Sequence, residues 1–513
     1  MTREQSHCYN KKREQRRFLV GIASLGDAFL RSCGRCRTPR RCAVGCAAGR
    51  RDKKAGRMCL PQAIQVRQMA VKERKIMEQL TKKDVLRLVE EDDVEFIRLQ
   101  FTDMFGILKN IAVTARELPK ALNNECIIDG SFIDGMEGEE VTDMYLHPDP
   151  STFAILPWRP QQGKVARLLC DIYRPDQTPY PISSRYVLER VYQEAKEMGY
   201  DILVDPECEF FLFHTDDDGM PTTVTHERAG YLDLSPVDLG ENARRDIVLA
   251  LEDMGFDITS SHHEIAPAQH EIDFDYAPAD RMADQIMTFK MAVRTIARRH
   301  GLHATFMPKP LVNVNGSGMH LNLAVYKNGK NILQKEEDTL GLSREGYYFM
   351  GGLLAHSKEM AAVTNPLVNS YKRLVPGFEA PTEVTWSQGD KSSLIRLPMG
   401  RGKDTKIELR SPDAAANPYL VFAACIAAGL HGIKNKIDPE CFYKKKAAEE
   451  GKTFELLPRT LKEAIDLMEQ SQWMRRLLGD QFFDQYLAAK KKEWETYSRQ
   501  VSNWELEEYL YRF

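Results

Sequence analysis

Two closely spaced carboxylates are the first feature of the sequence that could do chemistry. Glu207 and Glu209 are separated by one residue and run into the apolar segment Phe210–Phe213. This pattern is typical of an interior β-strand, on which residues two apart point to the same face. Carboxylates on one interior face repel each other unless a cation or another partner lies beside them. The pair predicts a cation site or, as the plainer alternative, a solvated strand face.

Further acids and imidazoles follow along the chain. The run 260–273 contains Glu264, Glu271 and three histidines, and taken alone it fits a hydrogen-bond network better than a metal site. His320 opens a later strand pattern after a glycine-rich turn, and Glu408 lies on another short period-2 segment. Together with Glu207 and Glu209, this set suits a pair of hard divalent cations, Mg²⁺ or Mn²⁺.

Three arginines, Arg373, Arg396 and Arg410, complete the set. Metals and guanidinium groups neutralise the charge that develops on a transferring phosphoryl group. Such a site is therefore expected to carry out phosphate chemistry. For one arginine alone, a surface ion pair worth about 0–1 kcal/mol is the simpler interpretation. The sequence has no Walker A loop, and Leu321 occupies the third glycine position of a dinucleotide fingerprint. A nucleotide would need another architecture.

The elements that must position these residues form two groups. A capping-box pattern predicts a helix at 72–92, and three strand patterns follow at 94–101, 109–113 and 165–173. After a Pro- and Asp-rich linker, helices and short strands alternate. Helices are expected at 185–198, 241–254, 279–300, 345–363 and 416–435, and strands at 207–213, 270–276, 303–308 and 319–326. The pattern predicts an α+β protein with domains at 69–178 and 179–513.

The first 68 residues have a different composition. They contain 17 Lys and Arg against 4 Asp and Glu, within a chain of net charge −3, and they hold six of the eleven cysteines. A C-x2-C and a C-x3-C pair have spacing that Zn²⁺ would accept, and an import or export segment is a second alternative. We expect instead a disordered extension, or sequence upstream of a natural start at Met69.

Length and composition narrow the class of protein. The chain has 513 residues, 43% of them apolar and 28% charged, as in soluble globular proteins. The longest apolar stretch, near 421–430, is shorter than the roughly 20 residues that span a bilayer. The five cysteines beyond residue 68 are scattered, which favours a reduced, cytoplasmic protein without a membrane partner.

From about residue 76 to 513, the chain resembles a bacterial type I glutamine synthetase of the Gram-positive-like subgroup. Many spaced motifs agree jointly, among them Phe101-Thr-Asp, Asp129-Gly-Ser, Glu207-x-Glu-Phe-Phe, Gly230-Tyr-x-Asp, His262-His-Glu-x-Ala-Pro-x-Gln-His-Glu271, Asn315-Gly-Ser-Gly-Met-His320 and Ser370-Tyr-Lys-Arg373. The resemblance implies a small β-grasp-like N-terminal domain and a large catalytic domain with a curved antiparallel sheet flanked by helices. It also implies a cytoplasmic homododecamer with active sites between subunits.

The reaction that this resemblance implies is ATP-dependent ligation of ammonia to the γ-carboxylate of glutamate through γ-glutamyl phosphate. Two to three Mg²⁺ or Mn²⁺ ions would serve each site. One metal would be held by Glu209, Glu264 and Glu271, and the other by Glu207, His320 and Glu408. The nucleotide would be bound by Glu207, Asn322, Lys391, Arg396 and Lys406. A nitrogen-regulatory protein is a further expected partner, whereas nucleic acid is not.

Substrate and catalytic roles carry over in the same way. Arg373 would clamp the α-carboxylate of glutamate, with Glu264 and Gly316 also binding the substrate. Phosphate oxygens would be contacted by Arg396 and Arg410, and Arg410 would also lie near the γ-carboxylate. The remaining roles belong to the flap residue Glu379, to Tyr231 in the ammonium pocket, and to Asp129, which a neighbouring subunit would contribute.

The sequence departs from the family pattern at several positions, and two alternative functions follow. Phe132 and Ala324 replace serines, and Phe454 stands where one subgroup has a modified tyrosine. Lys391 replaces an arginine in the phosphate-binding run, so a bidentate fork becomes a point charge. The alternatives are a γ-glutamyl ligase for another amine, such as a polyamine, and a ring-forming scaffold or regulator that has lost catalysis.

Overall fold

The computed structural model describes residues 80–135, 142–160, 162–445, 451 and 453–513. The chain divides into two compact units, and the described residues belong to the second, Met77–Phe513. The expected basic extension at 1–68 and the expected start at Met69 lie outside the described residues. Among the described residues, no helix has both the length and the apolar character that crossing a membrane requires.

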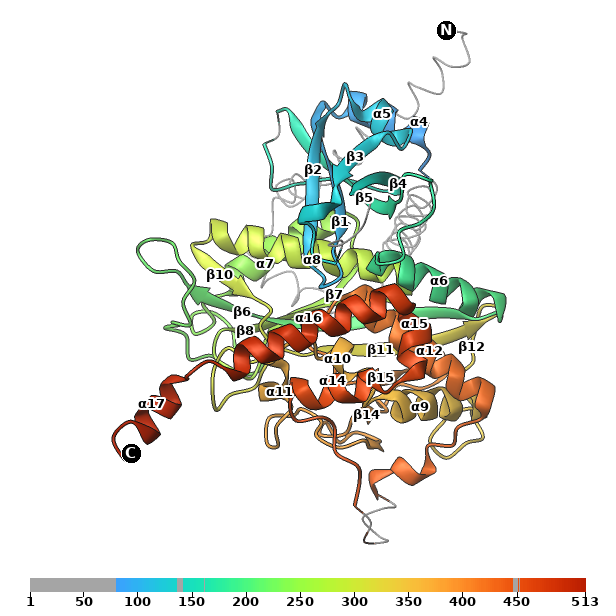
Figure 1. Cartoon of the computed structure of the whole chain (residues 1–513), viewed down its shortest axis with the longest axis vertical. Helices are drawn as coiled ribbons and strands as arrows, with labels where there is room; N and C mark the ends of the chain where they lie inside the picture. Colours follow the sequence, from blue (N-terminus) through green and yellow to red (C-terminus); the bar gives the residue numbers. More distant parts are fainter. Residues whose placement is uncertain (1–79, 136–141, 161, 446–450, 452) are drawn as a thin grey trace, which may run out of the picture. The chain divides into compact units, whose positions relative to one another are not determined.

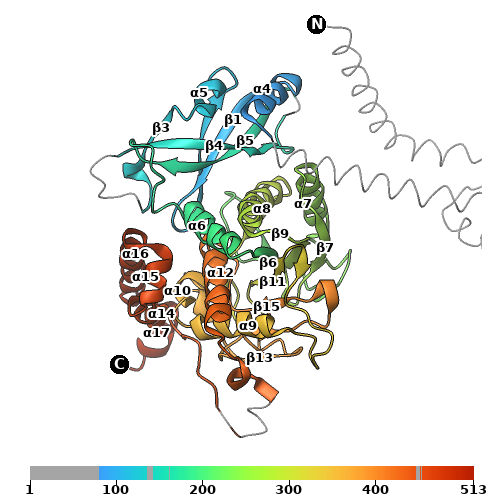
Figure 2. The ribbon, with the colours of Figure 1, turned by 90° about the vertical axis from the view of Figure 1, so that its right-hand side faces the viewer.

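A five-stranded sheet forms the N-terminal part of the described chain (Figure 2). Its order is β2-β1-β5-β4-β3, and only the central β1–β5 pair is parallel. The strands are β1 (Val94–Thr102), β2 (Leu108–Thr114), β3 (Cys126–Asp129), β4 (Asp143–Ile155) and β5 (Lys164–Tyr173). Helix α4 (Lys82–Glu91) starts at a capping box and packs Val85 and Val89 on this sheet. The sequence patterns did not predict strands β3 and β4.

The larger sheet has ten strands and carries the predicted site. Its main order is β13-β14-β15-β11-β6-β8-β7, with β9, β10 and β12 paired beside this path. The strands are β6 (Asp201–His214), β7 (Ile258–His263), β8 (Gln269–Phe274), β9 (Ala277–Pro278), β10 (Leu302–Thr305), β11 (Met319–Lys327), β12 (Lys330–Asn331), β13 (Trp386–Ser387), β14 (Ile395–Arg396) and β15 (Ile407–Leu409). It is antiparallel as expected, except that the short β13–β14 pair is parallel.

Three helices cover one face of this sheet. α6 (Ser184–Glu197), α8 (Ala279–Arg299) and α12 (Pro418–Asn435) contact one another, and α6 and α8 also contact β6. Figures 1 and 2 both show α8 between the two sheets. α12 is buried around most of its circumference, which explains why its sequence is apolar without a polar stripe. These helices fix β6 at the centre of the fold.

The remaining elements lie mostly in the C-terminal half of the chain. The helices are α5 (Leu118–Leu122), α7 (Glu241–Asp253), α9 (Arg344–His356), α10 (Ala361–Thr364), α11 (Ser370–Arg373), α14 (Leu461–Glu469), α15 (Gln472–Leu478), α16 (Asp480–Ser498) and α17 (Asn503–Tyr509). Short 3₁₀ turns in the described part of the chain are η1 (Gly130–Phe132), η2 (Gly402–Asp404) and η3 (Glu440–Phe442). The helix expected at 345–363 is thus divided into α9 and α10.

Candidate active site

Strand register brings the predicted carboxylates together around β6. Glu207 lies opposite His320 of β11, and Glu209 lies opposite Glu271 of β8. β15 extends the same sheet on the far side of β11, where it carries Glu408. Residues that are far apart in the sequence therefore meet on neighbouring strands, as the predicted cation site requires.

Glu207, Glu209, Glu271 and His320 line a cavity of about 310 Å³ whose walls carry opposite charges. The acidic wall includes Glu207, Glu209, Glu264, Glu271 and Asp273, with His262, Gln269 and His320 beside them. The basic wall includes Arg373, Lys391, Arg396 and Arg410. Tyr231, Asn315, Gly316, Phe378 and Glu379 complete the lining. Such a cavity can hold cations against one wall and an anionic group against the other.

The first group of ligand-type side chains joins β7, β8 and the turn between them. Potential ligand atoms of His262, Glu264 and Glu271 lie within 4.8 Å of one another. Nε2 of His262 is 3.0 Å from Oε1 of Glu264. Beside this group, Oε2 of Glu209 accepts hydrogen bonds from the side chain of Gln269 and from Gly318 N, both at 2.8 Å. Two of the three predicted carboxylates, Glu264 and Glu271, lie in this group with an imidazole, and Glu209 lies beside it, opposite Glu271 in the strand register.

The second group consists of Glu207, His320 and Glu408, whose potential ligand atoms also lie within 4.8 Å of one another. Glu408 is fully buried, and its two carboxylate oxygens face two guanidinium groups. Nε of Arg396 is 2.5 Å from Oε2, and Nη1 of Arg410 donates to Oε1. The acidic and basic walls of the cavity therefore meet at Glu408.

Burial and mutual repulsion shift the pKa values of the acidic wall. Burial raises the pKa of Glu209, and burial together with the Glu209 charge raises the pKa of Glu271 well above its ordinary value. Burial also opposes ionisation of Glu207, but contacts with His320 and Asn322 bring its pKa down to about 2. The acidic wall therefore carries carboxylates that a cation would stabilise in their ionised form.

The donor sets fit hard divalent cations. Each group offers two carboxylates and one imidazole, a combination that Mn²⁺ accepts and that leaves positions for water or phosphate oxygens around Mg²⁺. No cysteine is among these donors, so the set does not select soft metals. Their chemistry agrees with the metals expected from the sequence.

Arg373 lies deep in the basic wall with its guanidinium oriented by backbone oxygens. Nη1 donates to Ser411 O at 2.9 Å, and Nη2 donates to Arg410 O at 3.1 Å. A Cβ at Gly318 would lie 2.7 Å from Nη2 of Arg373 and 2.6 Å from Nε2 of His320. A Cβ at Gly316 would meet the carbonyl oxygen of Pro308. The glycine-rich turn therefore allows the arginine and the histidine to approach the same backbone.

The predicted flap residue sits at the mouth of the cavity. Glu379 has a left-handed backbone, with φ of 53°, which is uncommon for a residue with a side chain. Its Oε2 is 3.2 Å from Nζ of Lys391, and its carbonyl oxygen accepts from Nη2 of Arg410 at 3.2 Å. Tyr231 lies beside them, half exposed, with its ring edge-on to His262. The contacts of Glu379 connect the mouth to the basic wall.

Four predicted residues do not line the cavity. Glu408 lies behind it in contact with two arginines of the basic wall, and the amide of Asn322 donates to Glu207 Oε1 at 2.8 Å. Lys406 pairs with Asp205 at 3.5 Å on the same side. Asp129 lies at the end of β3 in the other sheet, exposed, with its carboxylate accepting from Ser131. Asp129 is therefore separate from the rest of the site within one chain.

Sequence reasoning missed several residues that shape the site. Gln269 orients Glu209, and His262 belongs to the first ligand group. Asp273 lines the cavity, and Asp205 lies behind it with a pKa that burial raises to about 7. His262 belonged to the histidine-rich run that the sequence singled out. Gln269 and Asp273 lie in the same run, but their place at the site follows only from the strand register, as does that of Asp205.

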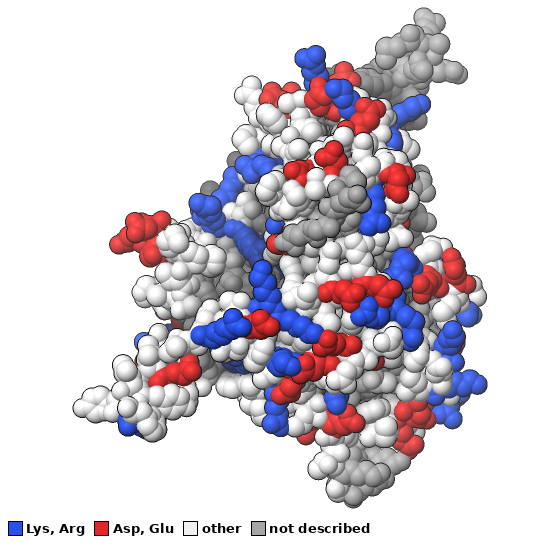
Figure 3. All heavy atoms as spheres, in the orientation of Figure 1, with Lys and Arg blue, Asp and Glu red and all other residues white. Residues whose placement is uncertain are grey.

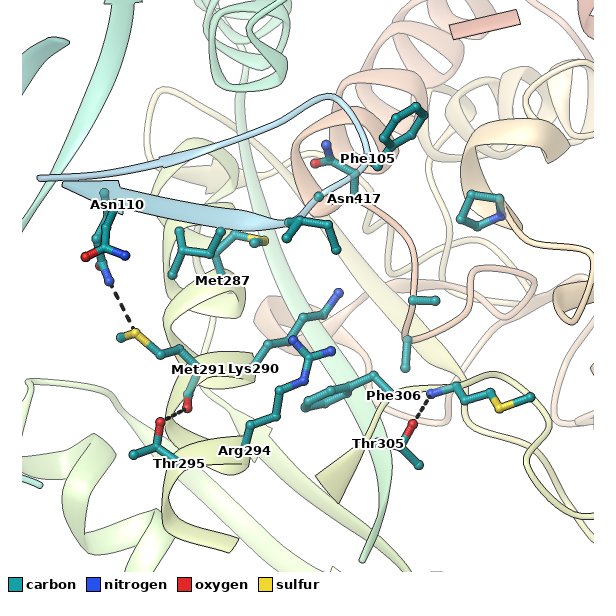
Figure 4. A pocket seen from close by; sticks show the side chains of 18 of the residues that line it. Phe105, Asn110, Met287, Lys290, Met291, Arg294, Thr295, Thr305, Phe306 and Asn417 are labelled. Carbon is teal, nitrogen blue, oxygen red and sulfur yellow. Dashed lines mark hydrogen bonds between the residues drawn. The ribbon is translucent and has the colours of Figure 1, made fainter. Parts of the chain in front are cut away.

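A larger cavity of about 650 Å³ lies elsewhere, between the five-stranded sheet and α8 (Figure 4). Arg294 and Lys290 of α8 point into it, as does Phe306, which follows β10. Met287 and Met291 of α8 also line it. Among the described residues, its lining contains five basic side chains and no carboxylate. Figure 3 shows a row of basic side chains crossing the visible face at the height of α8, whereas both signs mix elsewhere. The described residues that line this cavity include no carboxylate and no histidine, so its chemistry differs from that of the candidate active site.

Comparisons with known proteins identify the family. The family "Glutamine synthetase, catalytic domain" matches residues 181–509, and "Glutamine synthetase, beta-Grasp domain" matches residues 93–175. A glutamine synthetase of Clostridium saccharobutylicum is 53% identical over 443 residues, covering 85% of this chain and all of the relative. One from Methanosarcina mazei is 51% identical, with 84% and 98% coverage. One from Staphylococcus aureus is 48% identical, with 84% and 99% coverage.

Solved structures give the same result. The complex of GmaS with ADP has a TM-score of 0.76 at 32% identity and covers 83% of this chain and 99% of its own. The cryo-EM structure of Plasmodium falciparum glutamine synthetase has a TM-score of 0.76 at 26% identity, with 84% and 99% coverage. The expected fold, resemblance and enzyme class are confirmed. The chain belongs to the glutamine synthetase family of glutamate–ammonia ligases, which use ATP and divalent metals to form glutamine.

Proposed function

We propose that glutamine formation takes place in the 310 Å³ cavity, with the acidic wall holding Mg²⁺ or Mn²⁺ and the basic wall holding the anionic groups of the substrates. The observation that carries this proposal is the meeting of the two walls at Glu408. There a predicted metal ligand and two predicted phosphate-binding arginines, Arg396 and Arg410, are in direct contact. A phosphoryl group placed at this junction would face cations on both sides.

In this proposal, Arg373 binds the α-carboxylate of glutamate, and the bare backbone at Gly316 leaves room for the substrate beside it. Arg396 and Arg410 contact the oxygens of the transferring phosphoryl group, and Arg410 also contacts the γ-carboxylate. The bound metals would neutralise phosphate charge and favour attack of the γ-carboxylate on ATP. Glu379 and Lys391 would close the mouth and keep water away from the acyl phosphate.

Asn322 and Lys406 would act from behind the acidic wall. Both contact Asp205, and Asn322 also donates to Glu207. We therefore assign them to the nucleotide side of the site as residues that orient Glu207. Lys391 keeps a direct role, since its ammonium lines the cavity and remains able to bind phosphate as a point charge.

Metal binding is expected to strengthen as pH rises. The raised pKa values of Glu209 and Glu271 mean that the metal-free site retains protons that a cation must displace. At fixed Mg²⁺, the metal-induced increase in melting temperature should therefore grow from about pH 5.5 to about pH 7.5, because proton release favours binding at higher pH. Differential scanning fluorimetry with Mg²⁺, using Na⁺ as the control, measures this. An increase that is constant over this range would contradict a carboxylate metal site.

The amine acceptor is proposed to be ammonium rather than a polyamine. Tyr231 and Glu379 lie together at the mouth of a small cavity, and both favour a compact cation. We expect ATP-dependent phosphate release with glutamate and ammonium to exceed that with glutamate and putrescine by at least about a hundred-fold, because a long diamine does not fit behind a closed mouth. Comparable rates with the two amines would favour the alternative ligase.

The assembly is proposed to be a homododecamer in which Asp129 completes the site of a neighbouring subunit. Two features support this proposal: Asp129 is exposed, and it lies outside the lining of its own chain's cavity. A nitrogen-regulatory protein is also proposed as a partner. A cytoplasmic location is also proposed, supported by Cys170, Cys208 and Cys425, which are buried as free thiols.

A further inference from the structure

Glu227 lies outside the cavity but connects two segments that line it. It is buried in the segment between β6 and α7, four residues before Tyr231. Its Oε1 accepts from Ala268 N at 2.6 Å and lies 2.5 Å from Nε2 of His263, while Oε2 accepts from Leu239 N at 2.8 Å. Oε1 is therefore engaged by two groups of the β7–β8 region, and Oε2 by a backbone N–H of its own segment.

His263 extends this contact to a predicted metal ligand. Its Nδ1 is 2.6 Å from the backbone oxygen of Glu264. A carbonyl oxygen only accepts, so Nδ1 of His263 must be the donor, and the ring is held between Glu227 and the Glu264 backbone. The chain of contacts runs from the Tyr231 segment to the residue that contributes a carboxylate to the first ligand group.

The same carboxylate fixes the other end of the β7–β8 turn. Ala268, whose N–H binds Glu227, has a left-handed backbone with φ of 64°. The next residue, Gln269, accepts from Ala266 N at 3.2 Å through its side chain, which also donates to Glu209 at 2.8 Å. Glu227 thus anchors a turn whose two ends orient Glu264 and Glu209.

This buried cluster does not need a metal ion of its own. Glu227, Asp238, His263 and His270 have ligand-type atoms within 4.8 Å of one another, but a guanidinium occupies the place of a cation. Nη1 of Arg244 lies 2.8 Å from Asp238 Oδ2 and 2.9 Å from Nδ1 of His270. His263 and His270 therefore belong to a hydrogen-bond network, which was the plainer alternative for this histidine-rich run.

We propose that Glu227 is a positioning residue that acts through His263 and Ala268 to hold Glu264 in its metal-binding orientation. The inference rests on the proposed assignment of Glu264 as a metal ligand. Removing Glu227 would leave His263 and two backbone N–H groups without their acceptor, and the turn would lose the contact that joins its two ends. Partners of metal ligands affect metal affinity without touching the metal.

The test compares Glu227→Ala and Glu227→Gln with the wild type in full-length, assembled enzyme. We expect Glu227→Ala to raise the Mg²⁺ concentration for half-maximal glutamine formation by about ten-fold or more, the scale seen for partners of metal ligands. The KM for glutamate should also rise, whereas the KM for ATP, measured at saturating metal, should change less than about two-fold. Glu227→Gln keeps an acceptor oxygen for Ala268 and should recover part of the loss.

Two further variants separate the possible outcomes. Glu359→Ala breaks a similar Glu–His contact, that of Glu359 with His356, away from the cavity, and should lower stability without changing the Mg²⁺ requirement. Glu264→Gln should weaken Mg²⁺ activation by at least as much as Glu227→Ala. If Glu264→Gln has no effect, the proposed ligand assignment fails. If Glu264→Gln weakens activation but Glu227→Ala shifts only the melting temperature, the positioning role is overturned.

Discussion

Replacing Glu209 with glutamine is expected to abolish turnover and, at the same time, to raise the melting temperature of the metal-free protein. The carboxylate lies on the central strand of the site, where Gln269 and Gly318 hold one oxygen in place. If Glu209 holds a cation as proposed, removing its charge would take one ligand from that cation beside the transferring phosphoryl group. We expect kcat to fall by at least about a thousand-fold, which corresponds to about 4 kcal/mol of barrier.

The stability effect has the opposite sign because the metal-free site is self-repelling. Burial and the neighbouring acids raise the pKa values of Glu209 and Glu271, so ionising them costs folding free energy when no cation is bound. Glutamine keeps the size of the side chain and removes one charge. Sites built for function are often destabilised in this way, and neutral substitutions in them stabilise the protein.

Three measurements check this prediction: steady-state glutamine formation, the melting temperature in EDTA, and the melting temperature in saturating Mg²⁺. Asp201→Asn is a matched control, since Asp201 begins the same strand but pairs with Lys196 at the surface. The control should keep both activity and the Mg²⁺-induced stabilisation. A Glu209→Gln enzyme with activity within a few-fold of wild type would refute the metal assignment, and a lower melting temperature in EDTA would refute the repulsion argument.

Local patterns in the sequence were enough to predict the strand that carries the site. The period-2 spacing of Glu207 and Glu209 and the apolar residues after them define an interior strand with both acids on one face. The structure places both side chains in the cavity on β6. Helices with strong apolar periodicity and clear end signals, such as α8, were predicted to within two residues for the same reason.

What the sequence could not provide is the register between strands. Glu207 faces His320, and Glu209 faces Glu271, because of backbone pairing over separations of 113 and 62 residues. No local pattern encodes such pairings, so the grouping of ligands came from resemblance rather than from spacing. Strand β7 was missed because its residues, Ile258–His263, are mostly polar and do not alternate. Glu227 was missed because its partners lie on other segments.

The position of Asp129 leads to the second large effect, recovery of activity from two inactive variants. Asp129 lies outside the lining of the cavity that contains Glu209, and its carboxylate is exposed on the N-terminal sheet. If a neighbouring subunit supplies it to the ammonium pocket, each site takes Glu209 from one chain and Asp129 from another. Asp129→Ala should raise the KM for ammonium far more than the KM for ATP, because an anionic pocket concentrates ammonium.

Mixing two inactive variants tests whether neighbouring subunits share each active site. Asp129→Ala and Glu209→Ala chains, each inactive at low ammonium, are to be unfolded together, reassembled in equal amounts and assayed. With random head-to-tail assembly, about a quarter of the sites would combine an intact Glu209 with an intact Asp129, so about a quarter of wild-type activity should return. Glu209→Ala mixed with Glu264→Ala should recover nothing, since both residues belong to the same chain's wall. Absence of recovery in the first mixture, with assembly verified by light scattering, would mean that Asp129 does not complete a neighbour's site.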